Sequence, residues 1–179
     1  MYIVRTISGI GAVLIVAFAI SNIIHFRMVK LNNFDSQDMQ LFSYYISYNS
    51  EEILQLLSDN NIEFRKMSKI DNDDITGLYF FDEIWIKEGY IQKSLNHEIG
   101  HFVDDYYKFT QNQEFIEIYN QEKDNMQKDY YKDDIGEYFA ECYKMYVERW
   151  PALDNYPQTK DFFERNIGRA NIQEDFTFL

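Results

Sequence analysis

Hydrophobic residues recur at helical spacing over most of the chain. The pattern predicts one helix in residues 35–49 and a second in residues 50–61. Asn49 is a possible N-cap of the second helix, with Glu52 three residues on as its capping-box partner. Helical spacing returns in the second half of the chain, where Pro151 is well placed to end the helix before it. The chain is therefore expected to be mainly helical.

Residues 75–90 follow a different pattern. Their hydrophobic residues alternate on either side of a turn at Asp82 and Glu83; they are Leu78, Phe80, Ile84 and Ile86. Such alternation predicts a hairpin or two short strands. Glycine and proline number only 7 and 2, and no internal repeat or low-complexity linker divides the chain. We therefore expect one α+β domain that is mainly helical and contains a short sheet.

The first thirty residues have the composition of a membrane signal. They contain no acidic residue, and the uncharged run from Thr6 to Ile24, about 19 residues, can just cross a bilayer. Ala17-Phe18-Ala19 resembles a signal-peptidase site, but the apolar run continues through Ile24, which favours an uncut anchor. We expect residues 1–30 to be a signal peptide or signal anchor that forms an N-terminal membrane helix. The folded domain would then be residues 31–179, exported and either anchored at the cell surface or secreted.

Charge narrows the classes of partner. The whole chain has a net charge of −13, and removing residues 1–30 leaves 14 basic and 30 acidic residues, a net charge of −16. A surface of this sign repels phosphate backbones, so we expect no binding to nucleic acid. The single cysteine, Cys142, cannot form an intramolecular disulfide and is expected to be a small core residue. Stability must then come from the hydrophobic core and, if present, a metal ion.

The most informative motif is LNHEIGHFVDDYY, residues 95–107, which contains two of the three histidines in the chain. On a helix, His97 and His101 stand one turn apart on the same face and can direct both imidazoles at one cation. Glu98 lies about 100° around the axis, beside such a cation, where it can take a proton from water. This is the HExxH pattern of zinc hydrolases, although a polar helix patch can match it by chance. The small Gly100 permits close approach of another element.

A catalytic zinc site needs a third protein ligand. No histidine follows His101, and Asp104 stands where the metzincin pattern requires glycine, so a carboxylate is expected. Glu137 and Glu141, four residues apart in the predicted helix 133–150, are the candidates. Glu137 would complete the ligand set, and Glu141 would accept the outer N–H of an imidazole, that of His97 being favoured. The alternative is that both glutamates are solvated.

The motif HEIGHFVDDYY followed by EYFAE resembles the catalytic domain of the anthrax lethal factor family of zinc metallopeptidases. That family also includes small secreted clostridial Pro-Pro endopeptidases. The resemblance extends over residues from about 75 to about 170. It implies a gluzincin fold in which a sheet edge lies beside the HExxH helix. It also implies that His97, His101 and Glu137 bind Zn²⁺ and that Glu98 is the general base.

The same resemblance implies an oxyanion-stabilising tyrosine seven residues before the glutamate ligand. That position is Tyr130 in this sequence, and the adjacent Tyr131 is the alternative. Without the resemblance, Tyr130 is one of 15 tyrosines and a packing role is favoured over a catalytic one, so the oxyanion role rests on the resemblance.

The function expected from these residues is that of a zinc-dependent endopeptidase. A zinc-activated water would attack a peptide or protein substrate with Glu98 as general base. The strand 83–87 could offer an edge for β-addition of an extended substrate, or it could be purely structural. The alternatives are an extracellular metal-binding interaction module, an inactive pseudopeptidase, or a zinc hydrolase with a non-peptide substrate. Glu98 favours an enzyme, because a structural zinc site does not need it.

Overall fold

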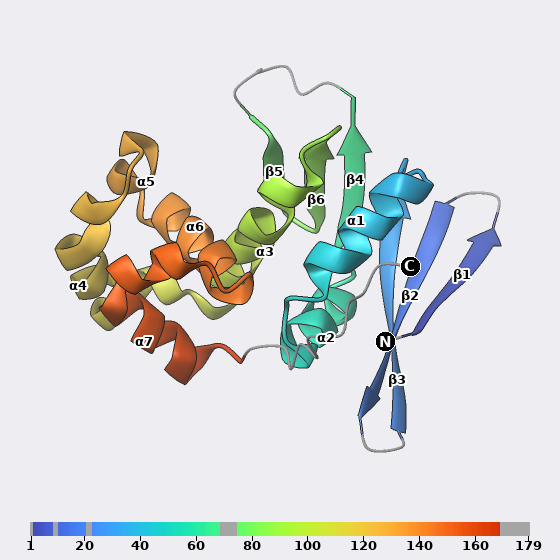
Figure 1. Cartoon of the computed structure of the whole chain (residues 1–179), viewed down its shortest axis with the longest axis horizontal. Coiled ribbons are helices and arrows are strands. Elements are labelled where there is room, and N and C mark those ends of the chain that lie inside the picture. Colours follow the sequence, from blue (N-terminus) through green and yellow to red (C-terminus); the bar gives the residue numbers. More distant parts are fainter. Residues whose placement is uncertain (1, 9–10, 21–22, 69–74, 169–179) are drawn as a thin grey trace.

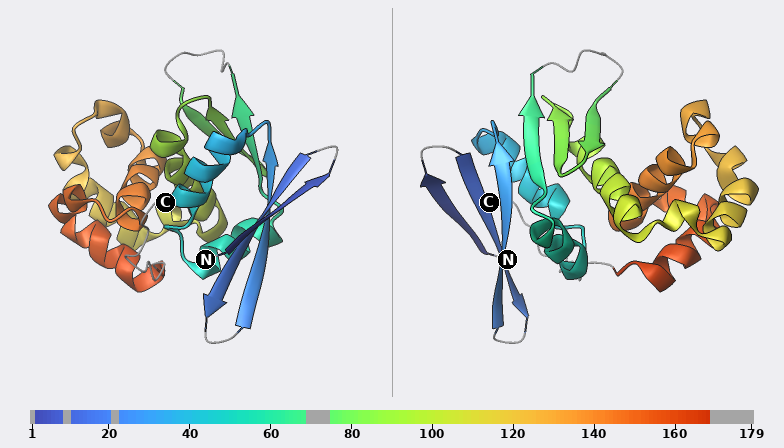
Figure 2. Two further views of the ribbon diagram at one scale, coloured as in Figure 1. Left: turned by 45° about the vertical axis from the view of Figure 1, so that its right-hand side comes forward. Right: turned by 180° about the vertical axis from the view of Figure 1, so that it is seen from behind.

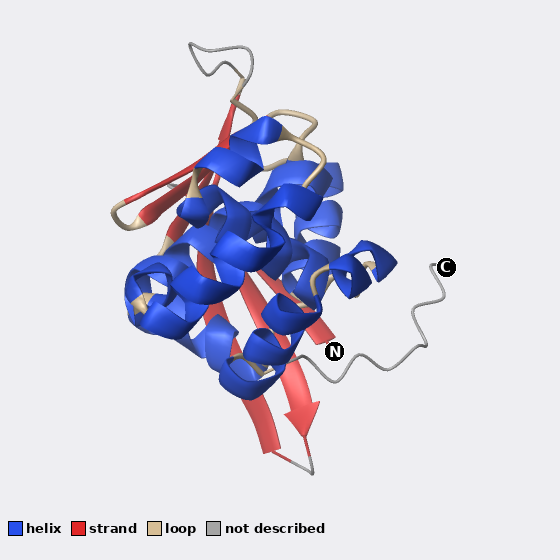
Figure 3. Ribbon diagram, turned by 90° about the vertical axis from the view of Figure 1, so that its left-hand side faces the viewer, coloured by secondary structure: helices blue, strands red, loops and turns tan. Residues whose placement is uncertain are grey.

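A computed structural model describes residues 2–8, 11–20, 23–68 and 75–168 of the chain. It is an α+β structure in which helices cover one side of a twisted sheet (Figures 1 and 3). The helices are α1 (Ser36–Ile46), α2 (Glu51–Asp59), α3 (Ile91–Tyr107), α4 (Gln113–Glu122), α5 (Asp129–Asp133), α6 (Ile135–Val147) and α7 (Pro157–Asn166). Short 3₁₀ turns follow α3, α4 and α6. The predicted mainly helical α+β class is confirmed for this part of the chain.

Six strands form one sheet in the order β1-β2-β3-β4-β6-β5. Their bounds are β1 Tyr2–Ser8, β2 Gly11–Ile20, β3 Ile23–Asn32, β4 Glu63–Met67, β5 Gly77–Phe80 and β6 Glu83–Lys87. The pairs β3–β4 and β4–β6 are parallel, and the other three pairs are antiparallel. Helices α4 to α7 lie on the far side of α3 from strands β1 to β3 (Figures 1 and 2).

The structure corrects the membrane helix predicted for residues 1–30. The described backbone of this segment is extended: β1 pairs with β2 and β2 pairs with β3. Valine, isoleucine and phenylalanine, which make the segment hydrophobic, are also strong strand formers, and hydrophobicity alone does not distinguish the two states. Among the described residues, no helix combines the length and apolar character that a bilayer span requires. The role of residues 1–30 as a signal peptide or anchor stays a prediction.

The start of α2 also differs from the prediction. Its N-cap is Ser50, whose hydroxyl accepts a hydrogen bond from the backbone N–H of Ile53. The Asn49 side chain is instead buried, where its amide donates to Asn96 Oδ1 over 2.8 Å and its oxygen accepts from the Tyr143 hydroxyl over 2.5 Å. These contacts connect the end of α1 to α3 and α6, and thereby fix how the two later helices meet the sheet.

The predicted hairpin is present, but its position in the sheet corrects the expected substrate edge. Strand β6, residues 83–87, has β4 on one side and β5 on the other, so both of its edges are already paired. The edge strand is β5, and α3 packs against it. Strand β4 was missed because three of its five residues are charged, which hides a strand with a single core residue, Phe64. Among the residues that the structure describes, nothing pairs with the outer edge of β5, so the site helix has a free strand edge beside it, as the resemblance implied.

Helices α3 and α6 run antiparallel and pack at very short range. A Cβ built on Gly100 would lie 2.9 Å from the Ala140 Cα and 3.1 Å from its carbonyl oxygen, so the backbones touch where a side chain would otherwise stand. Beyond this contact, Phe115, Phe139 and Phe163 form a fully buried aromatic cluster, in which the ring centroid of Phe139 lies 5.2 Å from that of Phe115 and 5.1 Å from that of Phe163. Cys142 is free and buried in the same region, which confirms its expected core position.

Gly100→Ala should destabilise the protein. The added methyl group has no room against the Ala140 backbone and must push α3 and α6 apart, so we expect the free energy of unfolding to fall by about 1–3 kcal/mol. Chemical denaturation of the two proteins measures this. Gly168→Ala is the control, since a Cβ there meets nothing closer than 3.6 Å. Equal stability of all three proteins would show that the helices are not in close contact.

Candidate active site

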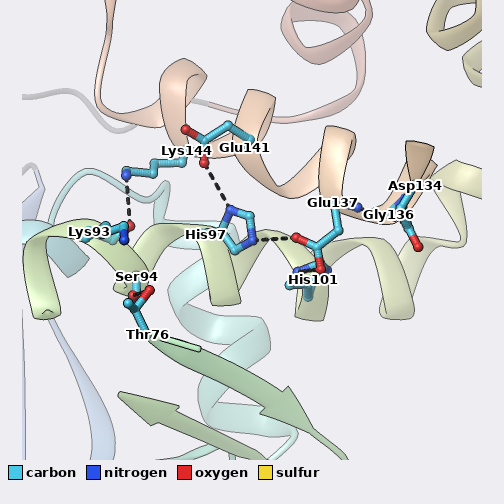
Figure 4. Close-up of polar contacts among 10 residues, drawn as sticks. All are labelled: Thr76, Lys93, Ser94, His97, His101, Asp134, Gly136, Glu137, Glu141 and Lys144. Atoms are coloured by element: carbon cyan, nitrogen blue, oxygen red, sulfur yellow. Dashed lines mark hydrogen bonds and ion pairs between the residues drawn. The ribbon is translucent and has the colours of Figure 1, made fainter. Parts of the chain in front are cut away.

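The site forms where α3 and α6 face each other (Figure 4). Helix α3 presents His97 and His101 one turn apart, and α6 presents Glu137 in its first turn. The start of α6 is fixed by Asp134, whose carboxylate accepts hydrogen bonds from the backbone N–H groups of Gly136 and Glu137. The N-terminal end of α6, capped by Asp134, thus lies against the middle of α3.

Three predicted ligands converge on one point. His97 Nε2 lies 3.1 Å from Glu137 Oε2, and His101 Nε2 lies 3.5 Å from Glu137 Oε1. One ligand atom from each residue lies within 4.8 Å of the other two. A tetrahedral zinc ion with bonds of about 2.0–2.1 Å separates its ligand atoms by about 3.3 Å, so the observed spacing fits. The group could hold a metal ion.

Glu141 lies one turn after Glu137 and contacts the other nitrogen of His97. His97 Nδ1 and Glu141 Oε2 are 3.1 Å apart. A carboxylate in this place fixes the imidazole tautomer that leaves Nε2 free to bind a metal ion. The arrangement is the one expected from the four-residue spacing of the two glutamates.

The carboxyl group of Glu98 is buried under strand β5. It accepts a hydrogen bond from the backbone N–H of Tyr79, and a Cβ built on Gly77 would lie 2.9 Å from Glu98 Cγ. Burial raises the pKa of Glu98 despite the opposing charges of His97 and His101. A raised pKa brings a carboxylate closer to the value needed to exchange protons at neutral pH. Sequence reasoning missed Gly77, because nothing in the sequence shows that its missing side chain makes room for Glu98.

The two tyrosines on α5 reach different glutamates. The Tyr130 hydroxyl hydrogen-bonds to Glu137, while the Tyr131 hydroxyl hydrogen-bonds to Glu141. Burial raises the pKa of both phenols, and the neighbouring carboxylates raise it further. Both therefore remain hydrogen-bond donors at neutral pH. Tyr130 is 61% exposed, so its hydroxyl is also accessible from the cleft.

In the metal-free protein, the pKa of the predicted ligand Glu137 is lowered and the pKa of the predicted ligand His97 is raised. Burial raises the pKa of Glu137, but hydrogen bonds from His101, His97 and Tyr130 outweigh it and hold the pKa well below its usual range. Burial lowers the pKa of His97, but hydrogen bonds to Glu137 and Glu141 outweigh that effect and raise the pKa to about 9. The site thus stabilises one cation, which in the metal-free protein is the His97 imidazolium.

A cleft of about 1040 Å³ opens in front of these residues. Strand β5 forms one wall through residues 77–79, and α5 forms another through Tyr130 and Tyr131. Asp105 lines one end and accepts a hydrogen bond from the Tyr79 hydroxyl over 3.1 Å. The neighbouring Asp104 has a structural role instead, because its carboxylate accepts two hydrogen bonds from Thr110. The volume is at the upper end of the range for ligand pockets, so the cleft has room for a segment of peptide.

Comparison with known proteins confirms the resemblance inferred from the two motifs. Residues 83–155 match the family model described as "Anthrax toxin lethal factor, N- and C-terminal domain". Among solved structures, the Pro-Pro endopeptidase PPEP-2 from Paenibacillus alvei has a similar fold, with a TM-score of 0.64 and 20% sequence identity. That similarity covers 76% of this chain and 95% of the other. No curated protein that was compared matches this chain significantly.

Gly77→Ala should reduce turnover without removing a bound metal ion. The new methyl group would displace Glu98, which is not among the three converging ligands, so we expect kcat/KM for a cleaved peptide to fall about 10- to 100-fold. Metal content by elemental analysis and peptide turnover are measured on the same preparation. Gly168→Ala again serves as the matched variant. Full activity of the Gly77→Ala protein would argue against a role for Glu98 at this position.

The metal-free protein should lose stability as the pH rises. Because the pKa of His97 is raised from 6.5 to about 9, its stabilising contribution is complete below pH 6.5 and disappears as the pH passes through 9. We expect a loss of about 1–3 kcal/mol in the free energy of unfolding between pH 7 and pH 10, measured in the presence of a chelator. The free energy of unfolding of the His97→Gln protein should fall less over the same pH range, because the titrating imidazole is missing. If the stability of both proteins depends on pH in the same way, His97 is not the group responsible for the loss.

Proposed function

We propose that this protein is a zinc-dependent endopeptidase. The observation that carries the proposal is the convergence of His97, His101 and Glu137 beside a buried carboxyl group, Glu98, at the floor of a peptide-sized cleft. Two histidines and one glutamate leave an open position on a tetrahedral zinc ion, as catalysis requires. The lethal factor match and the fold of the Pro-Pro endopeptidase support the same reaction class.

Each residue of the site has a distinct task in the proposed reaction. When bound, the zinc ion supplies Lewis acidity, which makes water acidic and polarises the scissile carbonyl. Glu98 takes a proton from the attacking water and passes it to the leaving amine. The Tyr130 hydroxyl donates a hydrogen bond to the oxyanion. Glu141 holds the His97 ring in orientation through Nδ1.

The substrate is proposed to bind as an extended chain along β5. This strand pairs with β6 on one side only, and within the described chain no strand pairs with its other edge. Thr76 just before β5, Gly77 at its start and Tyr79 near its end all line the cleft. An added strand there would run past Glu98, which brings a peptide bond to the catalytic carboxyl group. This replaces β6 as the proposed substrate edge.

The competing interpretation is a metal-binding interaction module without catalysis. A closed structural zinc site commonly uses four protein ligands and has no need of a buried carboxyl group beside them. Here Glu98 is buried at 5% exposure and the cleft reaches it, so the arrangement favours an enzyme. Export and membrane attachment through residues 1–30 remain predictions from composition.

Three substitutions separate metal binding from catalysis. Glu98→Gln should keep the metal ion and lower kcat/KM by about 10²- to 10⁴-fold, because it removes the general base. Glu137→Gln should lose the metal ion. Tyr130→Phe should keep it and lower kcat by at least about tenfold, because one oxyanion donor is lost. Zinc content by elemental analysis and cleavage of a peptide library are the measurements.

Tyr131→Phe is the matched control for Tyr130→Phe, since both remove one hydroxyl from the same helix. We expect it to affect turnover less, because Tyr131 bonds to Glu141 and not to a proposed ligand. A larger loss for Tyr131→Phe would transfer the oxyanion role to that residue. Turnover that survives Glu98→Gln would exclude the proposed mechanism.

A further inference from the structure

One end of the cleft is lined by lysines in a protein whose net charge is −13. Lys93 comes from α3, Lys144 from α6, and Lys128 from the segment just before α5. The other end contains Asp105. The cleft therefore carries positive charge at one end and negative charge at the other.

The lysine end has a defined place relative to the ligands. Lys93, His97 and His101 follow one another at four-residue intervals along one face of α3. The antiparallel helix α6 presents Glu137, Glu141 and Lys144 in the opposite direction, and Lys144 Nζ donates to the Lys93 carbonyl oxygen over 2.8 Å (Figure 4). The lysine end therefore begins about one helical turn, or 5.4 Å, from the metal-binding residues.

Strand β5 runs along the same axis and relates this end to the direction of a substrate. Thr76 Oγ1 accepts a hydrogen bond from Ser94 Oγ over 2.9 Å at the lysine end, and Tyr79 reaches Asp105 at the other. An added strand that pairs antiparallel with β5, as β6 does, starts at the Tyr79 end and leaves past Thr76. Residues after the cleaved bond then lie among the lysines.

Two of the three lysines, Lys93 and Lys128, are exposed. The ammonium groups of Lys93 and Lys128 each lie 5.3 Å from the centroid of a tyrosine ring, that of Tyr90 and Tyr131 respectively, and neither forms an ion pair with a described residue. Lys144 is buried, with its ammonium 4.7 Å from the centroid of the Trp150 ring, and its charge lowers the pKa of Glu141 and acts on Glu148, so it is not available to a substrate in the way that Lys93 and Lys128 are. Glu141 is the only described carboxylate that lines this end, and it is already bonded to His97.

We propose that the lysine end binds a carboxylate group of the substrate on the C-terminal side of the cleaved bond. An extended chain advances about 3.3 Å per residue, so a distance of one helical turn places this carboxylate about two residues after that bond. It belongs to an aspartate or glutamate side chain or to the C-terminus of a short peptide. The inference rests on the proposed peptidase function and adds substrate selection to it.

The test compares peptides that differ only in charge. The full-length, zinc-loaded protein is given peptides with Asp or Glu, or with Asn or Gln, at each of the three positions after the cleaved bond. Each peptide is prepared with a free and with an amidated C-terminus. We expect kcat/KM to be about tenfold higher for an acidic residue at one of these positions, or for the free C-terminus. An effect of the acidic residue identifies a side-chain carboxylate as the bound group, and an effect of the free C-terminus identifies the terminal carboxylate.

Charge reversal assigns the preference to the lysines. The double variant Lys93→Glu, Lys128→Glu changes two exposed residues and should abolish or invert the preference while neutral peptides are still cleaved. Lys123→Glu is the control, because Lys123 also lies over a tyrosine ring, that of Tyr119, but outside the cleft. Buried Lys144 is left unchanged.

The outcomes separate this inference from the proposed function. If neutral and acidic peptides are cleaved equally well, or if the preference survives the double variant, the inference is overturned while the peptidase function stands. If no peptide is cleaved at all, the proposed function fails and this inference fails with it.

Discussion

The close contact of α3 with α6 is the constraint on which the rest of the structure depends. Gly100 lets the two helix backbones meet at Ala140, and only at that separation can two imidazoles from one helix and a carboxylate from the other approach the same point. The contact is maintained from both sides. The aromatic cluster packs behind α6, and the buried amides of Asn49 and Asn96 connect both helices to α1.

The two glutamates beside the paired histidines have pKa values that are shifted in opposite directions. Three hydrogen-bond donors hold the pKa of Glu137 well below its usual range, whereas burial raises the pKa of Glu98 on the facing helix. Two carboxyl groups with pKa values displaced in opposite directions suit two different tasks, a permanent ligand and a proton carrier. The strand β5 contributes to this difference, since it covers Glu98 but leaves Glu137 facing the cleft.

Much of the site, but less of the fold, follows from the sequence. The helical spacing of His97 and His101, and of Glu137 and Glu141, implies one shared face on each helix, and the structure brings all four side chains together. The space that Gly77 leaves for Glu98 depends on contacts between distant segments, which no local pattern reveals. The same holds for strand order: the polar strand β4 inserts beside β6 and thereby moves the free edge to β5. The first thirty residues are plainly hydrophobic in the sequence, but this composition fits the strands β1 to β3 as well as a helix.

The central claim is that α3 and α6 together hold one zinc ion. The most direct measurement is a crystal structure of the zinc-loaded, full-length protein with anomalous diffraction recorded on both sides of the zinc absorption edge. The account predicts one strong anomalous peak within about 2.2 Å of His97 Nε2, His101 Nε2 and a Glu137 carboxylate oxygen. No peak at that position, or a peak bound by other residues, would contradict it.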